Sequence, residues 1–596
     1  MPSRTSSYLS TALGGLLVLA GMIPSASTWI GWLRDTAAVP ADLMASLLLG
    51  ALLFKGTLVV AGLVVLVLGR LRLGSAHADP SVSPPHHDTM HLAMLTVLLV
   101  TALILRLYRL GDGLWHDEIA TYINYGHLSV GELITTYDSQ NQHFLFSLLA
   151  RASLTLFGEG AWALRLPAVL FGVGSIWAMY LLGREVGTVR EALLSAALMA
   201  FAYHHVWFSQ NARGYSGLLF WTLLTSWFLV RGLRGAPPKI WLGYAVTAAL
   251  GVYTQLAMLF VIAGHFVIYL LHQVRQHRKA RPVRWAGLFL GFGLAGLCTL
   301  LLYALVVPQF LADFTGRTQA TTFSTWQNPL WTLFEIVRAM HIGFAGGSVG
   351  LAGLVVFGIG LRSWIRTNSL VVQLLFITTA ICALAAVATG HNLWPRLFFF
   401  AMGFGILVVI RGLLVLGDWL ARRLRLPAPL ATRLGITLSL GLILLSALSV
   451  LFVYGPKQDY QGALAFVEAN RQPGDLVVTT GMAAFTFREY YRQNWPSIES
   501  AEVLYDLRKQ ARRTWLIYAF RPHMEALHRD VLSMIERDFT VIKRFDGTLG
   551  NGTIFVCRSE TTATFSLPQA ELAHDEAPLI SSETPWAIRV GSNRAR

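Results

Sequence analysis

Long apolar segments follow one another through the first 455 residues of this 596-residue chain. The hydrocarbon core of a bilayer is about 30 Å thick, so a helix needs roughly 20 apolar residues to cross it with its backbone groups satisfied internally. Only 13% of the residues are charged, whereas a soluble globular domain usually carries roughly 25%. We therefore predict a polytopic membrane protein with about thirteen spans. They lie near residues 8–25, 43–69, 91–110, 161–182, 191–208, 215–231, 240–254, 256–272, 285–307, 346–361, 370–389, 395–417 and 431–454.

Two of these segments have a second interpretation. The run at 240–254 is short, and together with its neighbour at 256–272 it can form one long bent helix. The run at 8–25 follows Arg4 and ends in small residues, which also fits a signal peptide. Because more spans follow, we predict that this first helix is not cleaved.

Lys and Arg residues gather in the short loops between the apolar segments. A formal net charge of +15 can indicate nucleic acid, but a nucleic-acid binder concentrates its charge on one soluble face. The basic loops instead fall on one side of the bilayer if the thirteen spans alternate, and that side is usually cytoplasmic. We predict the bilayer, and no nucleic acid, as a partner. The segments 111–160, 209–214, 309–345, 390–394 and everything after 455 then face outward.

The composition divides the chain into five parts. Residues 1–73 hold two extra N-terminal spans, and 74–90 form a Pro- and His-containing flexible cytoplasmic linker. Residues 91–455 form a membrane-embedded core whose outer loop is 111–160. Residues 456–559 alternate strand and helix patterns, with strands expected at 476–480, 514–519, 539–545 and 553–558, which predicts a small extracytoplasmic α/β domain. The polar tail at 560–596 is predicted to be disordered. The predicted fold class is therefore mainly α.

Adjacent carboxylates lie in the outer loop, directly after an outward-going span, in the sequence Gly-Asp-Gly-Leu-Trp115-His-Asp117-Glu118. Carboxylates at the membrane surface are candidates for a general base or a metal ligand. Neighbouring residues of a helix point about 100° apart, so we expect only one of Asp117 and Glu118 to face a reaction. An isolated pair of this kind is more often solvated. Its neighbourhood, including Gln142-His143 and Arg165, favours the functional interpretation.

Three arginines lie on the predicted outer side, against the positive-inside trend: Arg165, Arg213 and Arg396. One interpretation is that each guanidinium reaches back to the interface. The other is that it binds a phosphate in bidentate fashion. Trp115 and Tyr122 likewise either stack on sugar faces or belong to the aromatic belt at the interface.

Several stretches together resemble a known family. They are Trp115 to Glu118, 158–183 (GEGAWALRLPAVLFGVGSIWAMYLLG), 209–215 (SQNARGY), Tyr253-Thr254, Pro395-Arg396 and 459–478 (DYQGALAFVEANRQPGDLVV). The chain resembles, over roughly residues 91–480, the C-type-fold glycosyltransferases related to protein O-mannosyltransferases and the lipid A aminoarabinose transferase. The resemblance implies that Asp117 is the base or orients the acceptor, with Glu118 assisting. It implies that Arg165 binds the lipid phosphate.

The chain departs from that family at two places. Relatives often carry His-Pro where this chain has His143-Phe144, and a histidine after Tyr-Thr where it has Gln255. Because that histidine can serve a metal site, no cofactor is implied with certainty and a divalent metal stays an open alternative. We keep His143 with Trp115 and Tyr122 as candidate substrate-binding residues.

The resemblance implies an inverting glycosyltransferase in a bacterial inner membrane. Its donor would be a polyprenyl-phosphate sugar, and its acceptor a protein, lipid A or polysaccharide on the periplasmic side. One alternative is a transporter or flippase of lipid-linked glycans, which would be expected to show inverted repeats and interrupted helices near the membrane centre. The other is a polymerase or ligase of such glycans, which usually has one very large outer loop late in the chain.

Overall fold

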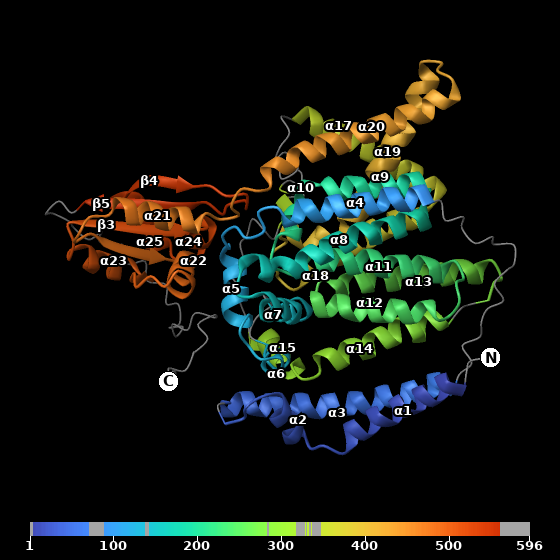
Figure 1. Ribbon diagram of the computed structural model, residues 1–596, viewed down its shortest axis with the longest axis horizontal. Coiled ribbons are helices and arrows are strands. Elements are labelled where there is room, and N and C mark those ends of the chain that lie inside the picture. Colours follow the sequence, from blue (N-terminus) through green and yellow to red (C-terminus); the bar gives the residue numbers. More distant parts are fainter. Residues whose placement is uncertain are drawn as a thin grey trace. The chain divides into compact units, whose positions relative to one another are not determined.

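A computed structural model describes residues 4–37, 39–70, 89–137, 142–282, 285–316, 328, 331–332, 335 and 347–560 (Figure 1). The chain divides into two compact units, Met1–Thr136 with His143–Pro456, and Tyr137–Gln142 with Lys457–Arg596. Most of the predicted linker at 74–90, and the predicted tail after residue 560, lie outside the described residues.

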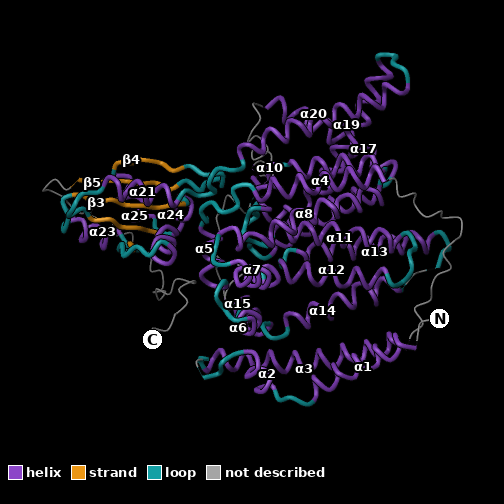
Figure 2. The backbone as a smooth tube through the Cα atoms, viewed as in Figure 1, coloured by secondary structure: helices purple, strands orange, loops and turns teal. Residues whose placement is uncertain are grey.

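The first unit is built from helices (Figure 2). Their bounds are α1 Arg4–Met22, α2 Ala26–Leu33, α3 Ala41–Arg70, α4 Thr89–Leu107, α5 His116–Tyr125, α6 Val130–Thr135, α7 Phe144–Phe157, α8 Ala161–Val186, α9 Val189–Phe201, α10 Tyr203–Ser209, α11 Tyr215–Leu233, α12 Ile240–Thr254, α13 Met258–Arg278, η1 Gly287–Gly293, α14 Leu294–Tyr303, α15 Val307–Gly316, α17 Gly347–Thr367, α18 Ser369–Ala388, η3 Pro395–Ala401, α19 Met402–Arg423, α20 Ala428–Ser449 and η4 Val450–Phe452.

Helices lie at each of the predicted spans, but the count of thirteen is not confirmed. Within the described residues, 8 helices are long and apolar enough to cross a membrane, or up to 11 if each of three sharply bent pairs is one span. The bent pairs are α1 with α2, α9 with α10, and Gly287–Tyr303 with Val307–Asp313. The segment at 240–254 remains a separate helix of 15 residues, shorter than a full span.

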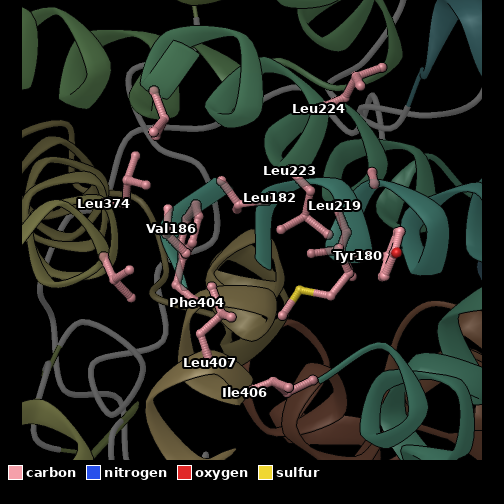
Figure 3. Close-up of a cluster of buried hydrophobic side chains, with 14 of the residues drawn as sticks. Tyr180, Leu182, Val186, Leu219, Leu223, Leu224, Leu374, Phe404, Ile406 and Leu407 are labelled. Atoms are coloured by element: carbon pink, nitrogen blue, oxygen red, sulfur yellow. The ribbon is translucent and has the colours of Figure 1, made fainter. Parts of the chain in front are cut away.

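Apolar side chains from α8, α11 and α19 interlock at the centre of this unit. Figure 3 shows Leu182, Leu219, Leu223, Phe404 and Leu407, all of which are buried. Burial of large apolar side chains against one another excludes lipid and holds the helices in one arrangement, since protein interiors are closely packed.

Pro167 lies inside α8 without ending it. A proline has no N–H, so the carbonyl four residues earlier, that of Ala163, loses its helical partner. The hydroxyl of Ser153 donates to this carbonyl at 2.7 Å. In an apolar medium such a replacement partner is required, and it ties α7 to the start of α8.

The break between α9 and α10 at Ala202 leaves helix-end carbonyls without intrahelical partners. Arg106 of α4 is the partner of one of these carbonyls. Its Nη1 and Nη2 both donate to the Ala200 carbonyl at 3.2 Å. Its Nη2 also lies 2.8 Å from Nδ1 of His205, and its Nε donates to the Ser209 hydroxyl at 3.2 Å. The Arg106 side chain is fully buried. One arginine thus stabilises the bend that leads into residues 209–213.

The two extra N-terminal spans, α1 and α3, pack closely on each other. The Gly14 and Gly62 backbones lie so near that a Cβ at either would fall under 3 Å from the other's carbonyl oxygen. Small residues allow this approach between helices in lipid. At one end of the hairpin, Ile30 and Leu47 pack with Leu305 of the core.

The second unit contains a five-stranded sheet of order β2-β1-β3-β5-β4. Strand β1 pairs in parallel with β2 and β3, while β5 is antiparallel to β3 and β4. The bounds are α21 Tyr460–Asn470, β1 Leu476–Thr480, α22 Met482–Phe485, η5 Thr486–Tyr490, β2 Ser497–Ile498, α23 Ala501–Arg508, β3 Arg513–Ala519, α24 Arg521–Leu527, α25 Arg529–Asp538, β4 Thr540–Phe545 and β5 Ile554–Glu560.

Side chains of β3 alternate between the two faces of this sheet. Trp515 and Ile517 pack with α21, while Leu516 and Tyr518 pack with α23, α24 and α25. The mainly α fold with a small C-terminal α/β part is therefore confirmed. The two-residue strand β2 was not predicted, because it is too short to show an alternating pattern.

Candidate functional site

Helix α5 begins one residue after Trp115 and carries both candidate carboxylates in its first turn. Negative charge is favourable there, since the N-terminal N–H groups of a helix are unpaired. The Glu118 carboxylate accepts the backbone N–H of Trp115 at 3.3 Å and that of Ala212 at 2.8 Å. Glu118 therefore links the start of α5 to the segment 209–213.

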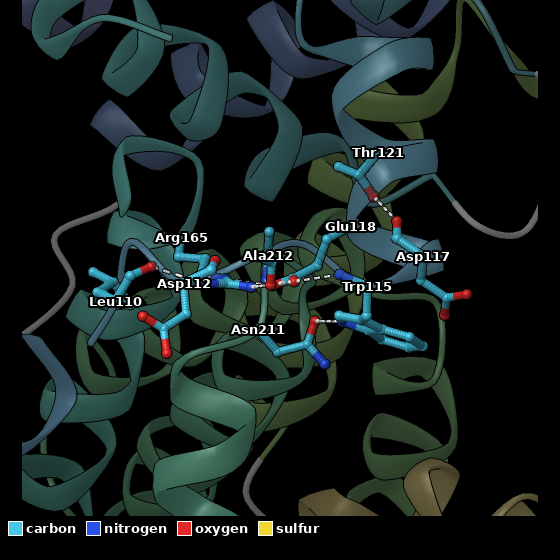
Figure 4. Close-up of polar contacts among 10 residues, drawn as sticks. Leu110, Asp112, Trp115, Asp117, Glu118, Thr121, Arg165, Asn211 and Ala212 are labelled. Atoms are coloured by element: carbon cyan, nitrogen blue, oxygen red, sulfur yellow. Dashed lines mark hydrogen bonds and ion pairs between the residues drawn. The ribbon is translucent and has the colours of Figure 1, made fainter. Parts of the chain in front are cut away.

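Glu118 and Arg165 form a buried bidentate ion pair (Figure 4). Arg165 Nε lies 2.8 Å from Glu118 Oε1, and Nη2 lies 2.6 Å from Oε2. The side chains are 0% and 4% exposed. The remaining N–H groups of Arg165 donate to the carbonyls of Leu110, Asp112 and Gly113 at 2.8–3.0 Å.

A guanidinium has five N–H donors, and these five contacts use all of them. The geometry thus differs from the role that the resemblance implied for Arg165. The guanidinium closes the loop at 110–113 onto Glu118, and in this conformation it has no donor left for a lipid phosphate. This arrangement favours a positioning role for both members of the pair.

The Asp117 carboxylate points away from this ion pair (Figure 4). Its Oδ2 lies 3.4 Å from Nη1 of Arg396, which η3 supplies. The Asp117 and Arg396 side chains are 14% and 38% exposed, so this pair is more accessible than the first. The Arg396 guanidinium lies 5.5 Å over the ring of Trp394. Asp117 and Glu118 thus lie in two different environments, as expected from their separation of about 100° around the helix.

His143 is within the electrostatic influence of the same arginine. It precedes α7 and is 5% exposed, with its ring centre 5.9 Å from that of Tyr215. Burial lowers the pKa of His143 well below its usual value, and the charges of Arg213 and Arg396 lower it further, while a hydrogen bond to the Thr254 backbone opposes the shift. The imidazole is therefore neutral at physiological pH.

Gly214 allows this close packing. A Cβ at Gly214 would lie 2.7 Å from the Thr254 carbonyl oxygen and 3.1 Å from Nδ1 of His143. Arg213, which is 2% exposed, precedes it. The segment 209–215 thus brings an arginine and a tyrosine to His143 while its Ala212 N–H binds Glu118.

The two predicted aromatic residues lie in different places. Trp115 is 4% exposed, and its indole N–H donates to Asn211 Oδ1 at 3.2 Å. Its ring stands beside Trp207, so it packs inside the unit. Tyr122 is partly exposed and its hydroxyl donates to Glu159 at 2.9 Å.

The structure therefore separates the eight predicted site residues into three groups. Trp115, Glu118 and Arg165 form a buried framework. In the second group, Asp117 pairs with Arg396, and the charges of Arg396 and Arg213 act on His143. Tyr122 stands apart from both, with Glu159.

Three residues that hold this region together were not predicted from the sequence: Arg106, Asn211 and Tyr215. Arg106 could have been identified from the sequence, because it is a charged residue inside the apolar run at 91–110. Charged residues at membrane depth commonly have a specific partner. Asn211 and Tyr215 lie in the quoted SQNARGY stretch, but nothing in that stretch shows which side chains turn toward Trp115 and His143.

A metal site does not fit the described residues. They contain no group of three or more His, Cys, Asp or Glu side chains that could hold an ion. At the position of the family's histidine, Gln255 is buried next to the carbonyl that binds His143. An amide and one imidazole are a poor donor set for a transition metal.

Comparison with known proteins supports the resemblance. Residues 141–303 match the model of the family described as Dolichyl-phosphate-mannose-protein mannosyltransferase. This match confirms the predicted resemblance over a segment that includes His143, Arg165 and Arg213. No curated protein matches the sequence.

Three solved structures are similar at low identity. ArnT from Cupriavidus metallidurans bound to undecaprenyl phosphate is 14% identical with a TM-score of 0.45, covering 79% of this chain and 98% of that one. AglB from Archaeoglobus fulgidus, an archaeal oligosaccharyltransferase in complex with an inhibitory peptide and a dolichol-phosphate, is 12% identical with a TM-score of 0.46, covering 80% and 75%. Arabinosyltransferase EmbB from Mycobacterium smegmatis is 11% identical with a TM-score of 0.41, covering 73% and 46%.

Proposed function

We propose that this multi-pass membrane protein is a glycosyltransferase that moves a sugar from a polyprenyl phosphate to a hydroxyl-bearing acceptor on the periplasmic side of a bacterial inner membrane. The observation that carries the proposal is the accessible Asp117–Arg396 pair held beside the buried Glu118–Arg165 pair. The family match over residues 141–303, whose description names a lipid-phosphate mannose donor, supports the same substrate class.

Asp117 is the base in this mechanism. Its carboxylate takes the proton of the acceptor hydroxyl while that oxygen attacks the anomeric carbon of the donor sugar. The bond from this carbon to the phosphate oxygen breaks, and the phosphate leaves with the electron pair. Attack from the opposite side inverts the anomeric configuration.

Arg396 stabilises the phosphate that leaves, with help from Arg213. Arg396 already faces Asp117 at 3.4 Å, a distance longer than a strong charge-assisted bond. It can therefore exchange the carboxylate for a phosphate oxygen when the donor enters. Fixed cations near a developing negative charge are worth roughly a hundredfold or more in rate.

Glu118 and Arg165 hold the base in place. Their buried pair joins the first turn of α5 to α8, to the loop at 110–113 and to Ala212. A base fixed in this way needs no reorganisation as the reaction proceeds. We assign these two residues to positioning and not to contact with the substrate.

The experiment uses purified protein with a panel of radiolabelled polyprenyl-phosphate sugars and acceptor extracts containing protein, lipid A or polysaccharide. Release of label from the carrier measures transfer. Asp117→Asn is expected to lose at least a hundredfold in rate while its thermal unfolding midpoint stays close to that of the wild type.

The matched control is Asp112→Asn in the same loop, because the Asp112 side chain forms only a half-exposed pair with Arg109. It is expected to keep its activity. Wild-type turnover by Asp117→Asn would remove that residue from the mechanism. Labelled carrier that stays intact but crosses proteoliposome membranes would favour a flippase, and growth of a glycan on the carrier would favour a polymerase.

A further inference from the structure

His143 carries a buried nitrogen that has no partner in the described part of the chain. The imidazole is hydrogen-bonded to the Thr254 backbone, and Nε2 is the atom without a hydrogen-bond partner. The bond to Thr254 therefore involves Nδ1, which carries the hydrogen and donates it to the carbonyl oxygen. Nε2 is left as an acceptor with a lone pair.

A second acceptor lies next to this position in the chain. Gln255 follows Thr254, is 9% exposed, and its Oε1 is also buried without a hydrogen-bond partner among the described residues. Buried polar atoms are nearly always hydrogen-bonded, because leaving one unpaired costs free energy. His143, which binds the Thr254 carbonyl, and Gln255, the next residue in the chain, thus each hold a buried acceptor that a ligand can satisfy by donating a hydrogen bond.

The chemistry of the two acceptors identifies the part of the donor that they can bind. The phosphodiester that joins a sugar to a polyprenol has one negative charge and no hydrogen, so its oxygens cannot satisfy Nε2 of His143. The hydroxyl groups of a sugar can. Arg213 and Arg396, whose charges act on the imidazole, are the complementary groups for the phosphate.

We propose that His143 Nε2 accepts a hydrogen bond from a hydroxyl group of the sugar on the carrier, and so binds the sugar while the arginines bind its phosphate. This inference rests on the proposed function and adds a specificity-determining contact to it. His143 is then a binding residue that distinguishes a glycosylated carrier from a bare one.

Two substitutions of His143 distinguish the roles of its two ring nitrogens. The amide of His143→Asn can reach the position of Nδ1 and keep the donation to Thr254, but it has no atom at the position of Nε2. His143→Gln places an amide oxygen near Nε2. The control is His127→Asn, which changes an exposed histidine of the same loop.

The measurement is the dissociation constant of the protein in detergent for polyprenyl-phosphate mannose, polyprenyl-phosphate glucose and bare polyprenyl phosphate. The wild type is expected to bind at least one glycosylated carrier more tightly than the bare one. His143→Asn is expected to reduce this preference roughly tenfold with unchanged affinity for the bare carrier, which corresponds to one lost hydrogen bond. His143→Gln should retain more of the preference, and His127→Asn all of it.

Each other outcome has a distinct meaning. The proposed contact is wrong, while the proposed function stands, if His143→Asn keeps the full preference for the glycosylated carrier. The same holds if the glycosylated and the bare carriers lose affinity equally. If a chelator abolishes the preference in the wild type, Nε2 binds a metal and the contact is also wrong. If the wild type binds no carrier and transfers no label, the proposed function itself fails.

Discussion

At the scale of single residues, two adjacent carboxylates of similar chemistry have different environments. Glu118 is fully buried, and its two oxygens receive Arg165 and two backbone N–H groups. Asp117, one position earlier on α5, reaches a partner that is 279 residues away in the chain. Burial and the number of donors around each carboxylate are therefore the basis on which we propose Glu118 as a positioning group and Asp117 as the base.

Removing one member of the Glu118–Arg165 pair should strongly destabilise the protein. Arg165→Leu leaves a buried carboxylate without its cation, and the loss of one partner of such a pair costs about 3–5 kcal/mol. We expect a lower midpoint of thermal unfolding in detergent. The double variant Glu118→Leu with Arg165→Leu should be less destabilised than the single one, because no charge stays unpaired. An unchanged midpoint with lost carrier binding would instead assign Arg165 to the phosphate.

The neutral state of His143 predicts a particular pH dependence. An unperturbed histidine titrates near pH 6.5, but the pKa of His143 is lowered by burial and by Arg213 and Arg396. The ring of Tyr215 also lies beside it. Sugar-dependent binding should therefore stay constant between pH 8 and pH 6.

The lowered pKa of His143 also makes the free energy of unfolding depend on pH. The unfolded chain binds a proton at His143 near pH 6.5 and the folded chain does not, so this residue lowers the free energy of unfolding as the pH falls below about 6.5. His143→Asn should lack that contribution. Comparing denaturant midpoints of the two proteins at pH 8 and pH 5.5 measures it, and equal pH dependence would contradict the neutral assignment.

At the scale of elements, breaks in helices place the residues of the site. The bend of 62° between α9 and α10 turns the chain toward residues 209–213. The carbonyl of Ala200, at the end of α9, is bound by Arg106. A cation at the C-terminal end of a helix is also favoured by the helix dipole.

Replacing Arg106 should disturb this bend more than it disturbs α4. Arg106→Met removes donations to the Ala200 carbonyl and the Ser209 hydroxyl in an apolar region. Hydrogen bonds from a charged group contribute about 1.5–3 kcal/mol each, so we expect a clearly lower unfolding midpoint and faster proteolysis. Arg109→Met, which changes an arginine that is 49% exposed, should shift stability by less than about 0.5 kcal/mol. Equal effects of the two substitutions would contradict the role of Arg106.

At the scale of the whole molecule, the helical unit and the sheet-containing unit have separate cores. The helical unit exposes large apolar side chains on most of its long helices, as lipid contact requires. The sheet-containing unit buries Trp515 and Phe487 between strands and helices, as soluble α/β proteins do.

The charge pattern predicts the orientation of the helical unit. In a chain with Cys298, Cys382 and Cys557 changed to alanine, Glu159→Cys should react with a membrane-impermeant maleimide in intact cells. Lys279→Cys should react only after the membrane is opened. Both positions are exposed. Reversed labelling would overturn the assignment of the basic loops to the cytoplasm.

Much of the fold was predictable because it depends on local sequence. Apolar runs of sufficient length become helices in lipid, and helices lie at every predicted segment. Strands β1, β3, β4 and β5 were placed within one or two residues. The number of spans was not predictable in the same way, because bends such as that at Ala202 come from contacts with a distant residue, Arg106.

Candidate site residues could be named from the sequence, but their pairings could not. The divergence of Asp117 and Glu118 follows from local helix geometry, since one residue of helix turns the side chain by about 100°. The pairing of Glu118 with Arg165 and of Asp117 with Arg396 depends instead on how remote helices pack. The physical reason is distance along the chain: helix formation depends on neighbouring residues, whereas ion pairing and burial depend on which remote segments the packed core brings together.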